Sequence, residues 1–371
     1  MGVESKGSNH GWAAADSLQE LSYLVKTAGA DVVGMFSQKL AAPSPTHYIG
    51  KGKITELVSL KEQTQYNTVI FDDELSPRQQ RNLEEVLKVK VIDRTALILD
   101  IFAKQARTHE GQLQVELAQH RYLFPRLVGQ WSHLERLGGG IGTRGPGESQ
   151  LETDRRLIRQ RINRLQHEIE HVRRHRAVYR ERRKETGVPI VALVGYTNAG
   201  KSTLFNTLSQ AGVVVEDKLF STLDPVTRGL ALPNGQQFLI TDTVGFIHKL
   251  PLSIIAAFRA TLEELSEADL LLHMVDITHK NAANQCRTVE EILNELSLKD
   301  KPKITVFNKL DLALASAQEM EALTAVPFFG EEIMLPDRNI ALISATEGWG
   351  EDKLLGKISS HLESSKIKVL S

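Results

Sequence analysis

One stretch of eight residues constrains this chain more than any other. Residues 195–202 read Gly-Tyr-Thr-Asn-Ala-Gly-Lys-Ser and follow the apolar run at 190–194. They match the pattern G-x-x-x-x-G-K-[ST] at the point where a predicted strand gives way to a predicted helix. The glycines let the backbone curl so that its N–H groups point inward, and the helix N-terminus adds its positive dipole end. We therefore predict a phosphate-binding loop on an α/β sheet.

Each position of this loop is a candidate contact for a nucleotide. Lys201 should reach the β- and γ-phosphates, which makes it a candidate catalytic residue, and the Ser202 hydroxyl is a candidate ligand for Mg²⁺. The alternative is a glycine-rich turn without a ligand, which the strand–loop–helix context disfavours. The predicted contacts are Gly195, Tyr196, Thr197, Asn198, Ala199, Gly200, Lys201, Ser202 and Thr203.

A second element, Asp-Thr-Val-Gly, stands directly after a predicted strand at 237–241. A carboxylate at a strand end can hold Mg²⁺, usually through water, so Asp242 is a candidate metal ligand. Gly245 lets a backbone N–H approach the γ-phosphate and is a candidate catalytic residue, with Thr243 and Val244 as nucleotide contacts between the two. An aspartate in this position is more often a cap or turn residue, but its register after a phosphate loop favours a nucleotide site.

Selectivity for the base is expected from a tetrapeptide that follows the predicted strand at 303–307. A carboxylate at Asp311 can accept both the N1–H and the exocyclic N–H of guanine, so it selects guanine over adenine. Asn308 can bridge two loops, and the aliphatic stem of Lys309 can cover the face of the base. A triplet after the last predicted strand could offer backbone N–H groups to the guanine oxygen. The residues concerned are Asn308, Lys309, Leu310 and Asp311, and then Ser344, Ala345 and Thr346.

A nucleotide switch also needs a threonine whose hydroxyl completes the Mg²⁺ coordination. Spacing alone leaves the choice open among Thr203, Thr207, Thr222, Thr227 and Thr241. Thr222 is best placed because it lies in a predicted loop, and it becomes a candidate catalytic residue. The predicted contacts of that loop are Phe220, Ser221, Thr222, Leu223 and Asp224, and the predicted metal ligands are Ser202, Thr222 and Asp242.

The residue after Gly245 is Phe246, where many GTP-hydrolysing switches carry a glutamine that orients the attacking water. A phenylalanine side chain cannot polarise water. Intrinsic hydrolysis should therefore be slow, or depend on backbone groups or on a residue supplied by a partner. This predicts a large partner that accelerates turnover.

The order of predicted strands and helices indicates three domains, at 1–107, 108–187 and 188–371. The first should be a small α/β domain and the last a second α/β domain that carries the motifs above. In the first we expect an irregular lead-in at 1–16, a helix capped by Ser17, and strands at 32–36, 68–71 and 89–92. We also expect a helix near 53–62, one that opens at Pro77 and one capped by Asp93.

The central region combines a glycine-rich loop with a long basic helix. Residues 138–147 are rich in glycine, which predicts a flexible loop. After it, apolar residues from Leu151 to Tyr179 recur in steps of three, four and seven, which predicts one long helix paired with the helix before the loop. Residues 152–185 hold 12 Lys and Arg against 6 Asp and Glu. A solvated coiled-coil arm is one interpretation, and a surface for RNA phosphates is the other.

The composition excludes several classes of protein. The net charge of −1 gives no global field for nucleic acid, and the single cysteine, Cys286, cannot form an internal disulfide, which fits a reducing cytosol. No apolar run reaches the roughly 18 residues that span a bilayer, and residues 1–16 lack the apolar core of a secretory signal. We expect a cytoplasmic monomer without stable membrane insertion, and leave peripheral membrane association open.

Together these motifs resemble the HflX family of translation-factor-class P-loop GTPases over residues 17–362. The most specific segments are Ile-Gly-Lys-Gly-Lys at 49–53 and the linker at 138–156, while GYTNAGKST, FSTLDPVTR, DTVGF and NKLD are also typical. The resemblance implies an N-terminal α/β domain, a long helical hairpin and a Ras-like G domain that hydrolyses GTP to GDP with Mg²⁺. It implies Thr222 as the switch threonine, since the loop around it matches.

The same resemblance implies nucleotide-switched binding to the large (50S) ribosomal subunit, with the 138–147 loop reaching into ribosomal RNA. A role in ribosome splitting, rescue or biogenesis would follow, and ATP hydrolysis is associated with some members. Two departures stand out. Some members carry an additional C-terminal domain, and this sequence ends soon after its last predicted helix. The lead-in also shows no strand where the family's first domain begins with one, so we expect an incomplete first sheet.

Two other functions stay open. One is a signalling or scaffold GTPase whose arm is a coiled-coil module for protein interaction. The other is an ATP-dependent RNA remodeller that uses the first domain. The second is disfavoured, because that domain has the turn at 50–53 but no second phosphate loop.

Overall fold

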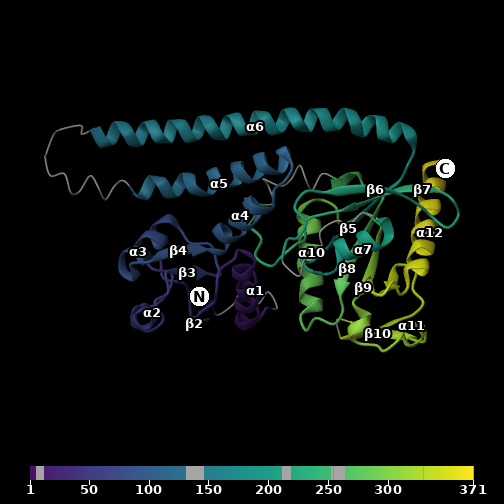
Figure 1. Cartoon of the computed structure of the whole chain (residues 1–371), viewed down its shortest axis with the longest axis horizontal. Helices are drawn as coiled ribbons and strands as arrows, with labels where there is room; N and C mark the ends of the chain where they lie inside the picture. Colours follow the sequence, from purple (N-terminus) through teal and green to yellow (C-terminus); the bar gives the residue numbers. More distant parts are fainter. Residues whose placement is uncertain are drawn as a thin grey trace. The chain divides into compact units, whose positions relative to one another are not determined.

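The computed structural model describes residues 1–5, 12–130, 146–210, 219–251, 254, 264–328 and 330–370. Contacts divide the chain into two compact units. The N-terminal unit comprises Met1–Arg173 with Lys249–Phe258, and the G-domain unit comprises Arg174–His248 with Arg259–Ser371. Both units combine strands with helices (Figure 1), which confirms the predicted α/β class.

A six-stranded sheet forms the centre of the G-domain unit. Its strand order is β12-β9-β8-β5-β7-β6, and all neighbours are parallel except the antiparallel pair β6 and β7. Such a sheet brings the carboxyl ends of its parallel strands to one edge, where ligands bind in open α/β sheets. The strands are β5 (Ile190–Gly195), β6 (Val226–Ala231), β7 (Gln237–Asp242), β8 (Leu270–Asp276), β9 (Lys303–Asn308) and β12 (Ile340–Leu342).

Alternation along the strands assigns side chains to the two faces of this sheet. Val191 and Leu193 of β5 belong to a buried cluster with Phe205 of α7 (Lys201–Ser209) and Ile358 of α12 (Glu351–Leu370). Val275 of β8 packs instead with Cys286 of α10 (Ala282–Glu295). Helices therefore cover both faces, and the strands are apolar on both sides, as a parallel sheet requires.

The five strands predicted for this unit are confirmed, and further elements are added. β6 escaped prediction because it is a half-exposed edge strand without an apolar run. An antiparallel pair, β10 (Ala325–Phe328) and β11 (Glu331–Met334), follows the short helix α11 (Ala317–Glu321). A single 3₁₀ turn, η2 (Leu310–Leu312), interrupts the loop after β9.

The N-terminal unit contains two parallel strand pairs, and backbone hydrogen bonds of Met1 connect one pair to the other. β1 (Gly2–Ser5) pairs with β2 (Ser37–Leu40), and β3 (Thr68–Phe71) pairs with β4 (Lys90–Asp93). The Met1 ammonium donates to the Ile70 carbonyl at 2.7 Å, and the Asp72 N–H donates to the Met1 carbonyl at 2.9 Å. The helices are α1 (Ala14–Thr27), α2 (Lys51–Thr64), α3 (Pro77–Leu87) and α4 (Arg94–Gln105).

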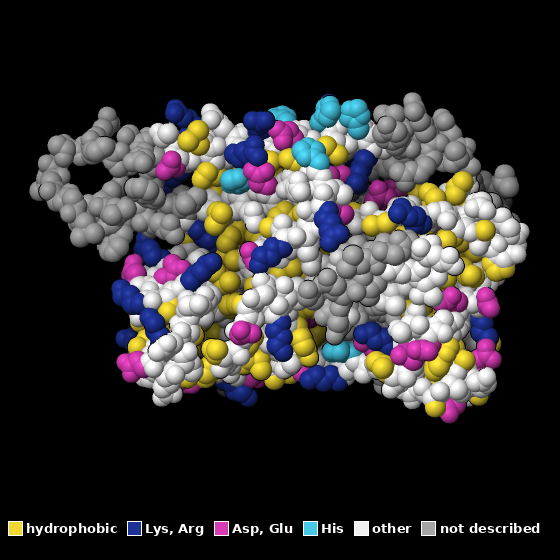
Figure 2. Space-filling view, in the orientation of Figure 1, with side chains coloured by type: hydrophobic (Ala, Val, Ile, Leu, Met, Phe, Trp, Pro, Cys, Tyr) yellow, Lys and Arg dark blue, Asp and Glu magenta, His cyan; other side chains and the backbone are white. Residues whose placement is uncertain are grey.

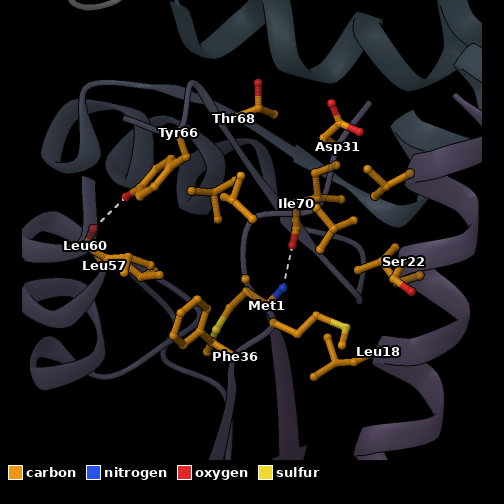
Figure 3. Close-up of a pocket in the computed structure, with 17 residues that line it drawn as sticks. Met1, Leu18, Ser22, Asp31, Phe36, Leu57, Leu60, Tyr66, Thr68 and Ile70 are labelled. Carbon is orange, nitrogen blue, oxygen red and sulfur yellow. Dashed lines mark hydrogen bonds between the residues drawn. The ribbon is translucent and has the colours of Figure 1, made fainter. Parts of the chain in front are cut away.

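Three expectations for this unit were wrong. The lead-in contains a strand, β1, and residues 32–36 form none, because the ladder with β1 begins where the Gly2 N–H donates to the Phe36 carbonyl. Residues 32–36 instead help to line a cavity of about 110 Å³, together with Leu18, Leu57 and Tyr66 (Figure 3). Ser17 does not cap α1, which begins at Ala14. Its buried hydroxyl donates to the Asp72 carboxylate at 2.6 Å.

The starts of α3 and α4 were predicted correctly. Ser76 accepts from the Gln79 N–H in a full capping box, with Pro77 at the first helical position. Asp93 accepts from the Ala96 N–H at 2.9 Å and is fully buried, where it also accepts from Tyr122 and Arg126 of the next helix. This carboxylate therefore ties α5 to the N-terminal sheet.

The helical hairpin predicted for the central region is present. α5 (His109–Gln130) and α6 (Pro146–Thr186) pack through Leu113, Leu117 and Leu165, the last fully buried. Arg161 donates two hydrogen bonds to the Glu116 carboxylate, at 2.7 and 2.8 Å, which fixes the register of the pair. Most of the predicted loop at 138–147 lies outside the described residues, and its last two positions, Pro146 and Gly147, belong to α6.

Within the described ranges, no helix has the length and apolar character needed to cross a membrane.

Candidate nucleotide site

The predicted phosphate loop lies between β5 and α7, and two of its glycines are required by their surroundings. Gly195 has φ 152° and Gly200 has φ 92°. A Cβ at Gly195 would lie 2.4 Å from the Met274 carbonyl oxygen, and one at Gly200 would lie 2.1 Å from the Asn308 amide nitrogen. Any other residue would therefore push the loop away from β8 or from the loop after β9.

Lys201 opens α7 and is buried. Its Nζ donates to the carbonyls of Gly195 and Tyr196, at 3.2 and 2.9 Å. Burial lowers the pKa of Lys201 to about 8, against the opposing effect of the Asp242 carboxylate. An ammonium held this way inside a loop of backbone N–H groups is well placed for a phosphate, whose negative charge would favour the protonated form.

The side chains of the three predicted metal ligands lie within hydrogen-bond distance of one another, although the residues are far apart in the sequence. Ser202 Oγ lies 2.7 Å from Asp242 Oδ2 and 2.8 Å from Thr222 Oγ1. Thr222 Oγ1 lies 2.9 Å from the same carboxylate oxygen. All three residues are buried, and burial raises the pKa of Asp242 although these hydroxyls and Lys201 oppose the shift.

This cluster suits a hard cation. The second carboxylate oxygen, Asp242 Oδ1, is buried and has no hydrogen-bond partner among the described residues. A buried acceptor without a donor is costly unless a cation or water satisfies it. Two hydroxyls and a carboxylate are the oxygen ligands that Mg²⁺ prefers, so the residues present fit that ion.

The loop after Asp242 returns to the phosphate loop and bonds to it. Phe246 donates its N–H to the Gly195 carbonyl at 3.1 Å and accepts from the Thr197 N–H at 2.7 Å. Its side chain is buried, so no side chain at this position orients water. A Cβ at Gly245 would lie 2.7 Å from Thr197 Cα and 3.0 Å from Lys201 Nζ, which places this backbone directly beside the lysine head.

The predicted base-reading residues are tied to the phosphate loop through Asn308. Its side-chain amide donates to the Ala199 carbonyl at 2.9 Å and accepts from the Ala345 N–H at 3.0 Å. The Asp311 carboxylate accepts from the Ser344 hydroxyl at 2.6 Å. The loops after β9 and β12 are thus locked together, with Asp311 half-buried at their junction.

Some predicted positions surround a common small cavity and others do not. The cavity, of about 30 Å³, is lined by Thr197, Asn198, Gly200, Lys201, Ser202, Thr203, Phe220, Ser221, Thr222, Thr243 and Gly245. Leu223 and Val244 are buried as apolar packing, Leu310 is also buried, and Thr346 is exposed. The Ala345 N–H is donated to Asn308. Of the triplet, Ser344 contributes a side-chain hydrogen bond, which the sequence did not predict.

Lys309 has a partner that the sequence analysis missed. Its Nζ lies 2.8 Å from Asp276 Oδ2, and its backbone adopts φ 66°. Asp276 ends β8, next to β9, where Asn308 lies opposite it in the sheet. Its position at the carboxyl end of a parallel strand was a signal that could have identified it.

The chain is similar to known GTP-binding proteins along most of its length. Three family models match in succession: "GTP-binding GTPase N-terminal" at 15–103, "GTP-binding GTPase Middle Region" at 105–183 and "50S ribosome-binding GTPase" at 190–309. A solved structure of a GTP-binding protein from the hyperthermophilic archaeon Sulfolobus solfataricus in complex with GDP covers 98% of both chains, at 25% identity and a TM-score of 0.48.

Curated relatives are closer in sequence. GTPase HflX of Caldanaerobacter subterraneus subsp. tengcongensis is 54% identical over 80% of this chain and 69% of its own length. GTPase HflX of Lacrimispora saccharolytica is 51% identical over 95% of this chain and 81% of its own length. GTPase HflX of Escherichia coli is 48% identical over 80% of this chain and 70% of its own length. The phosphate loop, the base-reading loops and these relatives together establish that the chain belongs to the HflX family of GTPases, enzymes that bind and hydrolyse GTP.

Proposed function

We propose that this GTPase is a Mg²⁺-dependent switch whose nucleotide state controls binding to the 50S ribosomal subunit. The observation that supports a switch is the buried, hydrogen-bonded cluster of Ser202, Thr222 and Asp242. These residues come from α7, the loop before β6 and the end of β7. The loop before β6 and the loop that follows Asp242 both meet at this cluster, so a bound ion would hold the two loops in one arrangement and its loss would release them.

Each residue of the site has a defined task in this proposal. The loop at 195–203 wraps the phosphates, with Lys201 on the β- and γ-phosphates. Ser202, Thr222 and Asp242 hold Mg²⁺, directly or through water, and the ion when bound neutralises charge on the phosphate oxygens. The Gly245 N–H faces the γ-phosphate, and Asp311 reads the guanine edge. Because Phe246 is buried and apolar, water activation falls to backbone groups or to a partner.

The proposed partner follows from the helical arm and from the family. Figure 2 shows Arg and His side chains along α6, where Arg156, Arg159 and Arg174 are exposed. Exposed guanidinium groups in a row suit the phosphates of ribosomal RNA. The family model described as a 50S ribosome-binding GTPase supports the same partner. The proposed role is ribosome splitting, rescue or biogenesis, performed by a monomer with domains at 1–107, 108–187 and 188–371.

Nucleotide-dependent co-sedimentation with 50S subunits tests this proposal. With a non-hydrolysable GTP analogue the protein should pellet with 50S, and with GDP it should pellet less. The affinity should fall steeply with salt, by about tenfold or more between 50 and 200 mM, because each phosphate contact releases counterions. The double variant Arg156→Gln, Arg174→Gln should reduce both the affinity and the salt slope.

The double variant Arg228→Gln, Arg287→Gln serves as the matched control, because it removes two positive charges from exposed positions on β6 and α10, outside the arm. Binding that is flat in salt would contradict the RNA-facing role of α6. Equal pelleting in both nucleotide states, or none, would favour the signalling GTPase with a protein-interaction arm. An ATPase activity that survives Lys201→Ala would favour the RNA remodeller.

A further inference from the structure

A cluster of three side chains with metal-binding atoms lies inside the G-domain unit, between β8 and α10. His273 belongs to β8, and Cys286 and Glu290 belong to α10. An imidazole nitrogen, the thiol sulfur and a carboxylate oxygen all lie within 4.8 Å of one another. None of the three residues belongs to the candidate nucleotide site, so the cluster needs an explanation of its own.

The backbone brings these residues together through two simple periodicities. Alternation along β8 puts His273 on the same face of the sheet as Val275, which packs with Cys286 of α10. Cys286 and Glu290 are four residues apart on one helix, so both side chains project from the same side of α10. The strand that carries the imidazole is hydrogen-bonded to β5 on one side and to β9 on the other. The three side chains are therefore presented by regular, fixed backbone.

The imidazole of His273 is the feature that points to a ligand. The side chain is 1% exposed, and its Nδ1 makes no hydrogen bond within the described ranges. This nitrogen faces Glu290 Oε1 at a distance of 3.4 Å. A buried ring nitrogen without a hydrogen bond is costly unless water or an ion satisfies it. A cation held between the imidazole, the thiol and the carboxylate would do so.

Glu290 provides negative charge and a route to solvent. Its side chain is 36% exposed, whereas Cys286 is buried. Lys303 of β9 donates to Oε1 of Glu290, the same oxygen that faces His273. The carboxylate thus already stabilises one positive charge at this place. Because Lys303 has a long flexible stem and is partly exposed, its ammonium group can move into water when another cation takes the carboxylate.

We propose that His273, Cys286 and Glu290 form a binding site for one zinc ion, separate from the nucleotide site. Imidazole, thiolate and carboxylate are the ligands that Zn²⁺ accepts, and a thiolate ligand disfavours Mg²⁺. In a tetrahedral site with bonds of about 2.0 to 2.3 Å, the ligand atoms lie roughly 3.3 to 3.8 Å apart, so the side chains close by about 1 Å. Water fills the fourth position. Binding replaces the thiol proton with the ion and releases that proton to solvent.

Cobalt absorption tests the sulfur ligand directly, because Cys286 is the single cysteine of the chain. The full chain, with GDP and excess Mg²⁺ to fill the nucleotide site, is titrated with Co²⁺ as a coloured substitute for Zn²⁺. A sulfur-to-cobalt charge-transfer band should appear, saturate at one ion per chain and disappear when Zn²⁺ is added. Cys286→Ser should lose the band. A wild-type chain that shows no such band at saturating Co²⁺ would overturn the proposal.

Zinc affinity, measured by competition with a chromogenic chelator, tests the other two ligands. His273→Gln and Glu290→Gln should each weaken binding at least about tenfold, since losing a ligand should cost no less than losing an outer-shell partner. Lys303→Met should tighten binding several-fold, because it removes the competing cation. Glu291→Gln, at an exposed position of the same helix, is the matched control and should bind zinc like the wild type.

A thermal melt of each variant separates loss of fold from loss of the ion, and Glu290→Gln keeps the test open if His273→Gln unfolds. Zinc should raise the melting temperature of the wild type, because it binds the folded state, and should raise that of folded Cys286→Ser much less. Zinc affinity that is the same in the wild type, Cys286→Ser and Glu290→Gln would mean that the ion binds elsewhere, which contradicts the assignment.

Discussion

Lys201→Ala should abolish measurable GTP turnover and weaken GDP and GTP binding by about two to three orders of magnitude, the loss expected when one preorganised charge is removed from a phosphate site. The Lys201 ammonium is buried beside Gly245 and within the phosphate loop. Among the described residues, it donates to two carbonyl oxygens of that loop. These neutral acceptors are poor counterions for an ammonium. A phosphate would replace them with a stronger charge-assisted bond.

Displacement of a fluorescent GDP analogue measures this effect directly. Lys201→Arg is the informative companion variant, because it keeps the charge but must fit a planar guanidinium into a buried space. It should recover little affinity if geometry matters as much as charge. A thermal melt shows whether each variant remains folded. Affinity within threefold of the wild type in folded Lys201→Ala protein would mean that the phosphates bind elsewhere.

Asp311→Asn should remove the preference for guanine, with a loss of GTP affinity of about 30-fold or more, because a charge-assisted pair at a half-buried position becomes a mismatch of two donors. The variant's amide would present an N–H where the guanine edge also presents N–H groups. Xanthine has a carbonyl in place of the exocyclic amine, so xanthosine triphosphate should gain affinity for the variant. The Ser344 hydroxyl can still bond to the amide oxygen, which preserves the loop.

Competition of GTP, ATP and xanthosine triphosphate against a labelled guanine nucleotide measures the change in selectivity. Asp352→Asn, at an exposed position in the first turn of α12, makes the same chemical change away from the site and should have no effect. An Asp311→Asn protein that kept the wild-type order of affinities would show that another group reads the base.

The sequence predicts which residues group around the candidate nucleotide site, because these residues belong to short motifs at strand ends. The phosphate loop, the loop that begins at Asp242 and the loop that begins at Asn308 all stand at the carboxyl ends of parallel strands, so their meeting follows from topology. Thr222 is different. The spacing of the motifs left five threonines as candidates for the switch residue. The hydrogen bonds of the Thr222 hydroxyl with Ser202 and Asp242 distinguish it from the other four.

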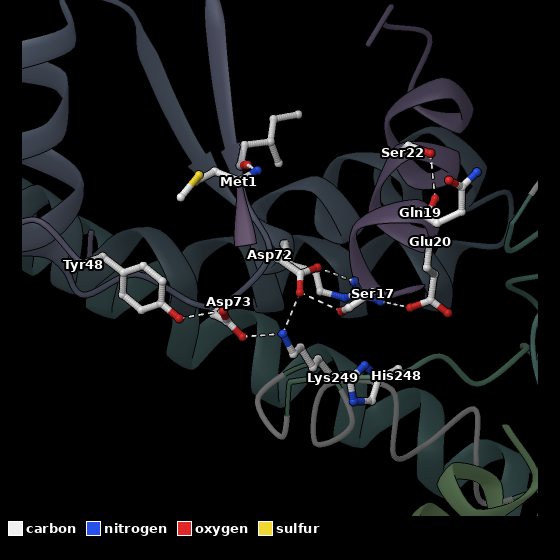
Figure 4. Close-up of polar contacts among 12 residues, drawn as sticks. Met1, Ser17, Gln19, Glu20, Ser22, Tyr48, Asp72, Asp73, His248 and Lys249 are labelled. Atoms are coloured by element: carbon white, nitrogen blue, oxygen red, sulfur yellow. Dashed lines mark hydrogen bonds and ion pairs between the residues drawn. The ribbon is translucent and has the colours of Figure 1, made fainter. Parts of the chain in front are cut away.

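The N-terminal unit was harder to predict because its strands depend on partners distant in the chain. Residues 32–36 carry a good strand pattern but lie beyond the ladder that β1 offers, and β1 itself has only four residues. Ser17 looks like a cap, yet its position is decided by the buried Asp72 carboxylate, which is 55 residues away. Lys249 Nζ likewise lies 2.6 Å from Asp72 Oδ2 and 2.5 Å from Asp73 Oδ1 (Figure 4). These partners are so distant in the sequence that no local pattern could indicate the ion pairs.

GTP turnover with and without purified 50S subunits tests the central claim most directly. Alone, the protein should hydrolyse GTP slowly and only with Mg²⁺, because Phe246 leaves the site without a side chain to orient water. With 50S subunits the rate should rise at least about tenfold, since groups supplied in trans can contribute far more than that. Equal rates with and without 50S would contradict the account of a switch completed by the ribosome.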